Sequence, residues 1–250
     1  MRGDRRPAAA QAADGIIGPM TRQPDFPPPP DQRSPSPGTP PRPTGAELEA
    51  ARGRTIPDVM APGLRVLFCG INPGLWSGAT GSHFARPGNR FWKVLHLSGF
   101  TDRLLAPWEG PDLPRIGLGI TNLVARTTAS EAELAPDEFR DGAERLRALV
   151  AAVGPAWLAV VGIGAYRTAF GVPKAAVGCQ PVRLGATGVW VLPNPSGLNA
   201  GYQLPALVAA FAELRTAVDR DTGATPVSGP PPPASQLRAV RQKAETGNVG

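Results

Sequence analysis

The sequence contains few of the side chains that bind metals. Its 250 residues include only 2 cysteines, Cys69 and Cys179, and 2 histidines, His83 and His96. Structural zinc sites and iron–sulfur clusters need about four such ligands, often four cysteines. Cys69 lies within an apolar segment, which is typical of a buried free thiol. We therefore expect no metal ion and no other cofactor.

Long apolar segments are also absent from the sequence. The longest run, residues 156–163, is far shorter than the ~20 residues that a membrane-spanning helix needs. The N-terminal stretch of residues 8–17 is interrupted by Gln11 and Asp14, so it lacks the apolar core of a signal peptide. We expect a cytoplasmic protein that does not contact membranes.

Proline, in contrast, is abundant and unevenly placed. Twelve of the 31 prolines lie in residues 1–55, and a run of four, residues 230–233, lies near the C-terminus. Neither end has apolar periodicity, so neither can bury enough surface to offset the entropy of an ordered chain. We expect disordered, Pro-rich basic tails at residues 1–55 and 223–250, and one domain of ordinary size at residues 56–222.

The net charge of +6 is spread evenly over these three parts. Basic residues exceed acidic ones by 2 in each of them: 8 against 6, 15 against 13, and 3 against 1. The tails thus carry most of the excess, which is compatible with loose, salt-sensitive contact to nucleic acid. Solvated linkers often have the same composition, so charge alone gives a weak case for a polyanionic partner.

One apolar stretch ends in a sharp turn. Residues 66–69 form a short apolar run, which is typical of a strand buried on both faces. Gly70, Asn72, Pro73 and Gly74 then break the run, so the strand ends in a tight turn. In open α/β sheets ligands bind beyond the carboxyl ends of strands, where Asn72 would lie. The alternative is that Asn72 only stabilises the turn by bonding its own backbone.

Strands and helices alternate along the rest of the domain. After a Gly-rich loop at 75–88 we expect a helix that begins at 89, a short helix that follows Gly164 and ends at 170, and helices at 101–105, 137–153 and 204–218. We expect strands at 119–124, 157–163, 182–184 and 189–192. This alternation predicts an α/β fold, a three-layer sandwich in which helices flank a central, mostly parallel sheet.

A second turn resembles the first. Asn-Pro-Ser-Gly at 194–197 follows the strand at 189–192, as Asn-Pro-Gly at 72–74 follows the strand at 66–69. If the two strands are parallel neighbours, both turns open at one sheet edge and can approach a ligand closely. Neither turn carries a phosphate-binding glycine motif, so a nucleotide hydrolase or dinucleotide enzyme is poorly supported. The alternative is that Asn-Pro-Ser-Gly is only a turn.

Three segments of the domain match the motifs of a known family. They are Gly-Ile-Asn-Pro-Gly-Leu at 70–75, Phe-Ala-Arg-Pro-Gly-Asn-Arg-Phe-Trp-Lys at 84–93, and Asn-Pro-Ser-Gly-Leu at 194–198. Together they resemble the mismatch-specific uracil/thymine-DNA glycosylase family of the uracil-DNA glycosylase superfamily, in order and over residues 58–217. The resemblance implies the uracil-DNA-glycosylase fold. It also implies that the protein hydrolyses the N-glycosidic bond of uracil, thymine or a damaged pyrimidine opposite guanine, a reaction that starts base excision repair.

The resemblance implies that Asn72 is the residue that holds the attacking water. A neutral amide is a poor base, but it can orient water against a sugar that is becoming an oxocarbenium ion. Positioning can supply about 7–11 kcal/mol, and each preorganised donor to the departing base about 3–4 kcal/mol. No lysine takes the first-motif position. The resemblance therefore implies a monofunctional enzyme that leaves an abasic site and forms no Schiff base.

Phe84 matches the family aromatic that stacks on the extruded base. Base flipping costs a few kcal/mol, least at a mismatch, and an aromatic platform returns about 1–3 kcal/mol. Ile71 and Phe84 are also expected to offer backbone groups to the edge of the uracil, as their family counterparts do. The alternative is that Phe84 belongs to the ordinary core.

Other positions resemble the pocket of the thymine-active branch. His83 would donate to a pyrimidine oxygen or else be an exposed loop histidine, and Asn122 and Thr128 would contact the base or else satisfy local turns. Ser77 is expected near the C5 position, where one methyl group changes binding by only about 1–3 kcal/mol. The preferred base therefore stays open. Gly74 and Asn89 complete the expected pocket.

The turn at 194–197 matches the family loop that fills the space left by the flipped base. Gly197, Leu198 and Asn199 would enter the duplex, with Asn194 and Ser196 in the same loop, because an apolar wedge flanked by glycine can prop a base stack open. Some relatives carry an arginine two residues after the leucine, whereas this chain has Ala200. That difference weakens any expectation about contacts to the unpaired guanine.

The expected partner is therefore double-stranded DNA with a mismatched or damaged base. We expect the protein to act as a monomer and, in a bacterium, to associate with the nucleoid. A second hypothesis is a non-catalytic sensor of mismatched or distorted duplex DNA. A third hypothesis, a nucleotide or nucleoside hydrolase, is disfavoured by the wedge at Leu198.

Overall fold

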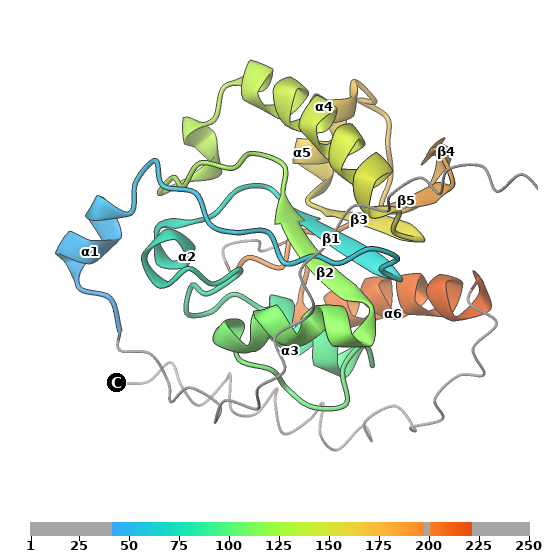
Figure 1. Cartoon of the computed structure of the whole chain (residues 1–250), viewed down its shortest axis with the longest axis horizontal. Helices are drawn as coiled ribbons and strands as arrows, with labels where there is room; N and C mark the ends of the chain where they lie inside the picture. The colour runs from blue at the N-terminus through green and yellow to red at the C-terminus, as the bar shows by residue number, and fades with distance from the viewer. Residues whose placement is uncertain (1–41, 198–200, 222–250) are drawn as a thin grey trace, which may run out of the picture. The chain divides into compact units, whose positions relative to one another are not determined.

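The computed structural model describes residues 42–197 and 201–221, and the sheet at its centre has five strands in the order β2-β1-β3-β5-β4 (Figure 1). The strands are β1 (Val66–Gly70), β2 (Leu118–Asn122), β3 (Trp157–Val161), β4 (Gly178–Leu184) and β5 (Thr187–Leu192). All neighbours pair in parallel except β4, which is antiparallel to β5. The mostly parallel sheet predicted from the sequence is thus confirmed.

Helices cover both faces of this sheet (Figure 1). They are α1 (Gly45–Ala50), α2 (Leu75–Thr80), α3 (Phe91–Leu97), α4 (Pro136–Val153), α5 (Ile163–Phe170) and α6 (Leu204–Asp221), with 3₁₀ segments η1 (Pro107–Ile116) and η2 (Glu131–Glu133). Residues of α3, η1 and α6 form one buried apolar cluster with the sheet, and residues of α4 and α5 form another. The predicted three-layer sandwich is confirmed.

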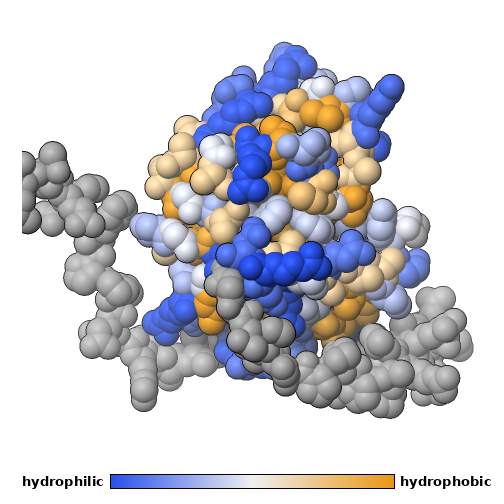
Figure 2. Space-filling view, turned by 90° about the vertical axis from the view of Figure 1, so that its right-hand side faces the viewer, coloured by the Kyte–Doolittle hydropathy of each residue, from blue (hydrophilic) through white to orange (hydrophobic). Residues whose placement is uncertain are grey.

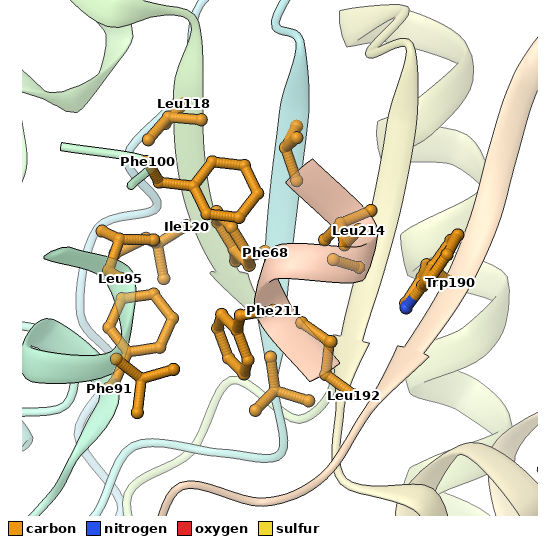
Figure 3. Packing of buried hydrophobic residues seen from close by; sticks show 14 of the residues in the cluster. Phe68, Phe91, Leu95, Phe100, Leu118, Ile120, Trp190, Leu192, Phe211 and Leu214 are labelled. Carbon is orange, nitrogen blue, oxygen red and sulfur yellow. The ribbon is translucent and has the colours of Figure 1, made fainter. Parts of the chain in front are cut away.

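The strand β1 contributes to both clusters because successive side chains of a strand point to opposite faces. Phe68 lies in the cluster with α3 and α6, whereas Leu67 and Cys69 lie in the cluster with α4 and α5. Figure 3 shows Phe68 among Phe91, Phe211 and other apolar residues. The ring centroids of Phe68 and Phe91 are 5.5 Å apart in an edge-to-face arrangement, a favoured geometry for aromatic pairs. This core fixes β1 and the turn that follows it.

Two local predictions are wrong. The Gly-rich stretch after the first turn begins with the helix α2, whose Gly78 lies so close to Thr127 that a Cβ atom would come within 2.7 Å of its Oγ1. Gly81, with a φ of 69°, ends that helix. Residues 101–105, predicted to be helical, form a bend at 101–103 followed by irregular chain, and the chain becomes helical only at η1. Proline begins η1 and interrupts it twice, which excludes a regular α-helix there.

The ordered structure also begins before the predicted domain boundary. Helix α1 starts with a capping box, in which Glu47 N donates to Thr44 Oγ1 (3.3 Å) and Thr44 N donates to the Glu47 carboxylate (2.8 Å). Ala51 behind it is fully buried. The boundary placed at residue 56 is therefore too late. The rest of the predicted tails, residues 1–41 and 223–250, lies outside the described residues.

The two Asn-Pro turns follow β1 and β5. The sequence led us to consider that these two strands are neighbours. They are not, because β3 lies between them. All three are parallel, however, so both turns still open at the same edge of the sheet. The shared edge brings together segments that are more than a hundred residues apart.

The remaining surface is mixed in character. Figure 2 shows polar residues interspersed with apolar ones on the side of the molecule where β4 forms the edge of the sheet. In neither of the two described ranges is a helix long and apolar enough to cross a membrane.

Candidate active site

The candidate site lies where β1 and β2 end. The last residues of the two parallel strands, Gly70 and Asn122, are partners in the register. Backbone hydrogen bonds continue beyond them: Leu123 N donates to Gly70 O (2.8 Å), and Thr128 N donates to Pro73 O (3.1 Å). The segment after β1 therefore lies alongside the segment after β2, at the sheet edge where ligands bind in open α/β folds.

The side chain of Asn72 is held by its amide nitrogen. Nδ2 donates to the backbone oxygens of Pro73 (3.1 Å) and Arg126 (3.1 Å) and to Oγ1 of Thr128 (2.7 Å). Because carbonyl oxygens only accept, these partners fix which end of the carboxamide faces them. Oδ1 points the other way and has no hydrogen-bond partner among the described residues. The nitrogen thus stabilises the turn, and the oxygen is left to accept a hydrogen bond from water.

Thr128 lies behind Asn72. Its Oγ1 accepts from Asn72 and donates to the backbone oxygen of Ser130 (2.8 Å), and the residue is 1% exposed. The hydroxyl proton is therefore used within the protein. This donor chain fixes the direction of the bond from Asn72, because an oxygen whose proton goes to Ser130 must accept from Nδ2. The structure places Thr128 where it can orient the amide.

The loop that supplies these acceptors is held by an ion pair between Arg126 and Glu138. The guanidinium of Arg126 makes two bonds to the carboxylate of Glu138 on α4 (2.6 and 2.8 Å) and a third to the backbone oxygen of Glu133 (2.9 Å). The bond from Arg126, together with the backbone N–H of Ala135, lowers the pKa of Glu138 to about 2. Such two-pronged pairs are geometrically specific. The backbone oxygen that faces Asn72 is thereby anchored to α4.

Phe84 and Asn122 meet above Gly70. A Cβ atom at Gly70 would lie 2.5 Å from Asn122 Oδ1 and 3.2 Å from Phe84 Cζ. The Phe84 ring is half-buried and stacks on Phe91, with centroids 4.0 Å apart. Phe84 has a φ of 52°, the only positive value outside glycine in the described residues. Such backbone strain persists where surrounding structure imposes it, often at functional sites.

His83 is buried rather than exposed. It is 4% exposed, its Nε2 lies 2.9 Å from Pro57 O, and its Nδ1 lies 3.2 Å from Asn122 Nδ2. Burial lowers the pKa of His83, and the bond to Pro57 and the charge of Asp58 oppose that shift only in part. The alternative of an exposed loop histidine is therefore wrong. The imidazole lies against Asn122.

The other predicted pocket residues bond mainly within the protein. Ser77 is buried and its Oγ accepts from Ala85 N (3.3 Å), and Asn89 Oδ1 accepts from the first residue of α3 (2.9 Å). Gly74 caps α2, and Ile71 packs against the cluster that contains α4 and α5. These residues shape the loop that carries His83 and Phe84. Their predicted contacts to a base stay predictions.

Arg90 joins this loop to the second Asn-Pro turn. Its guanidinium donates to the backbone oxygens of Pro195 (3.2 Å), Ser196 (2.6 Å) and Tyr202 (2.7 Å), and its own backbone N–H donates to Pro195 O (3.0 Å). One side chain therefore holds both ends of residues 195–202. The sequence interpretation missed Arg90 as a functional residue, although it lies within the second motif.

The predicted wedge is described only in part. Leu198 and Asn199 lie outside the described residues. Before them, Ser196 N donates to Asn194 Oδ1 (2.9 Å), and a Cβ atom at Gly197 would lie 2.7 Å from Gly88 O. The turn therefore needs glycine at position 197 to lie directly against the loop of residues 86–89.

Two cavities flank that loop. The smaller cavity, of about 230 Å³, lies between residues 86–89 and residues 196–197. The larger cavity, of about 630 Å³, is lined by Phe84, three tryptophans and three cationic side chains, among others. Those residues are Trp76, Trp92, Trp108, Arg42, Arg86 and Lys93. Aromatic rings beside cations suit nucleic acid. Asn72, which is partly buried, lines neither cavity.

A network behind Asn122 was also missed. Asp58 Oδ1 accepts from Thr121 Oγ1 (2.7 Å), its other oxygen lies 3.5 Å from Arg145 Nη1, and Arg145 donates to the backbone oxygen of Asn122. Val59 places this segment by an antiparallel bridge to β2. No motif signals these contacts, since they depend on pairing between distant segments.

In the residues described, no three His, Cys, Asp or Glu side chains gather as a set of metal ligands.

Comparison with known families agrees with the geometry of the site. The sequence model of the Uracil DNA glycosylase superfamily, whose members are DNA-binding hydrolases, matches residues 57–215. That range covers β1 to β5, both Asn-Pro turns and every predicted site residue, and it is well over half of the chain. The protein therefore belongs to the uracil DNA glycosylase superfamily.

Proposed function

We propose that this protein is a monofunctional, mismatch-specific DNA glycosylase that removes uracil, and thymine or damaged pyrimidines to a lesser degree, opposite guanine. The observation that supports the proposal most is the orientation of Asn72. Its nitrogen is bound on one side, which leaves Oδ1 as a fixed acceptor at the end of β1. A fixed acceptor orients water without the need for a strong base.

The proposed reaction begins when the mismatched base leaves the duplex. Its ring would stack on Phe84 beside Asn122, while residues 194–199 fill the space left in the helix. Water held by Asn72 Oδ1 then attacks C1′ as the glycosidic bond breaks; oxygen from water bonds to C1′, the bonding electrons leave with the base, and the water proton passes to solvent. No protein amine attacks the sugar, so the products are an abasic site and the free base.

The assay uses a duplex with a single G·U pair, followed by alkaline cleavage of abasic sites. We expect cleavage at the uracil with the wild-type protein, much less with Asn72→Ala, and less with a G·T pair. A silent wild-type protein would contradict the proposal. Mismatch-dependent binding that survives Asn72→Ala, without base release, would instead support a non-catalytic sensor of distorted duplex DNA.

Replacing Thr128 by valine should lower the rate of uracil release roughly 10-fold, the equivalent of one hydrogen bond. Valine keeps the shape but removes the acceptor that orients Asn72 Nδ2. The matched control is Thr127→Val. Thr127 Oγ1 is buried without a partner among the described residues, so its removal should leave the rate unchanged and raise the melting temperature. Equal losses of activity in the two variants would refute the role of Thr128.

Replacing Arg90 by alanine should lower the release of uracil from duplex DNA roughly 10- to 50-fold, because several bonds from a charged donor are lost. Lysine should restore little, since one ammonium cannot reproduce three bonds to separate carbonyl groups. Single-turnover rates and duplex affinity would be measured for both variants. Arg140→Ala, at an exposed arginine of α4, serves as the control. Full activity in Arg90→Lys would contradict the proposal that activity depends on the three bonds from the Arg90 guanidinium to backbone oxygens.

A further inference from the structure

A short chain of hydrogen-bond donors runs from Asn122 through His83 to the backbone oxygen of Pro57. His83 Nε2 lies 2.9 Å from Pro57 O, and His83 Nδ1 lies 3.2 Å from Asn122 Nδ2. His83 is 4% exposed and Asn122 is 6% exposed. Pro57 O can only accept, so Nε2 must carry the imidazole proton. In the neutral ring Nδ1 then has a lone pair, and it accepts a hydrogen bond from Asn122.

This chain determines which end of the Asn122 carboxamide faces the site. With Nδ2 bound to His83, Oδ1 lies above Gly70 and beside Phe84. Among the described residues it has no hydrogen-bond partner. An acceptor beside an aromatic ring complements a planar ring that carries an N–H group on its edge. Uracil and thymine have such a group at N3, whereas N3 of cytosine carries a lone pair that would face Oδ1 unfavourably.

We propose that His83 is a positioning residue that fixes which end of the Asn122 carboxamide faces the site, and that base release therefore depends on His83 keeping a single proton. This inference rests on the proposed function and specifies how its base is recognised. If His83 gains a second proton, Nδ1 becomes a donor and can no longer accept from Nδ2. The carboxamide must then turn over, and the pocket offers N–H groups where uracil also has one.

The surroundings of the pair keep His83 neutral at physiological pH. Burial lowers the pKa of its imidazole. Within the described part of the chain two charged groups face the pair: Asp58, which precedes β1, and Arg145 on α4, whose guanidinium donates to the backbone oxygen of Asn122. On β1 the thiol of Cys69 stays neutral, because burial raises its pKa far above the ordinary value. Uracil recognition should therefore be complete at neutral pH and fall only below an ordinary histidine pKa of about 6.5.

The test compares His83→Gln with His83→Leu in the full chain. Glutamine can donate to Pro57 O and accept from Asn122, but it does not titrate; leucine does neither. We expect His83→Leu to release uracil roughly 10-fold more slowly at pH 7.5, as expected for a lost hydrogen bond, and His83→Gln to recover most of that loss. The rate should fall at acid pH in the wild type and not in His83→Gln. Melting temperatures show whether His83→Leu folds.

A second readout does not depend on activity. The sequence has 2 histidines, so ¹⁵N-histidine NMR shows two imidazoles, and His83→Gln identifies the signals of His83. We expect a neutral ring with the proton on Nε2 and a titration midpoint that matches the acid fall in rate. A proton on Nδ1 at neutral pH, or an acid fall that persists in His83→Gln, would overturn the proposal. If the wild type releases no base at any pH, the proposed function fails, while the spectra still decide the hydrogen-bond chain.

Discussion

Replacing Asn72 by alanine should lower the single-turnover release of uracil from a G·U duplex by roughly 10²–10³-fold, the range seen when a preorganised polar group is removed from an active site. The loss should lie in the chemical step, because Oδ1 is the acceptor proposed to orient the attacking water. The affinity for the duplex should change less than about threefold, since the substitution leaves untouched the aromatic and cationic residues that are proposed to contact DNA.

The same substitution also removes the bonds that Nδ2 makes to the turn. Each such bond contributes about 0.5–1.5 kcal/mol to stability, so the melting temperature should fall modestly. Rates must therefore be measured well below the melting temperature of the variant. An unchanged rate, or a loss that disappears when the folded fraction is restored, would show that Asn72 serves only the turn.

Replacing Gly70 by alanine should abolish most activity, with an expected loss of at least ~10²-fold, while the domain still folds. The new Cβ would lie 2.5 Å from Asn122 Oδ1 and 3.2 Å from Phe84 Cζ, so the two groups that are proposed to hold the base must move apart. Displacements of about 1 Å can cost that much in a catalytic site. Uracil release and the melting temperature would be measured together.

The matched control for this prediction is Gly164→Ala on α5. A Cβ atom there would meet nothing within 4 Å, so activity should be unchanged and stability should rise by about 0.5–1 kcal/mol. If Gly70→Ala released uracil as fast as the control, Asn122 and Phe84 could not both contact the base at the site described above.

The strands could be predicted because their signals are local. The apolar run of β1 is followed at once by Gly70 and the Asn-Pro-Gly turn, and α4 begins at Pro136 and ends before Gly154. Such patterns depend on neighbours in sequence. The helix α2 was missed because it contains Gly78, which in a sequence favours a loop. In the structure Gly78 lies too close to Thr127 for any larger residue to fit.

The candidate site divides in the same way. Asn72 is found at the end of a strand from sequence alone, but the direction of its amide depends on Arg126 and Thr128, which are 54 and 56 residues away. Arg90 binds carbonyl groups 105–112 residues away. Contacts of this kind follow from the register of β1 and β2 and from the shared edge of β1 and β5. No periodicity in the sequence reports them.

The most direct test of this account is a crystal structure with a duplex in which 2′-fluoro-deoxyuridine faces guanine, because the fluorine slows departure of the base. We predict an ordered water within about 3.2 Å of Asn72 Oδ1 and about 3–3.5 Å from C1′, with Nδ2 still bound to Arg126 and Thr128. A carboxamide that turns Nδ2 toward the sugar, or a flipped base with no water between Asn72 and C1′, would contradict it.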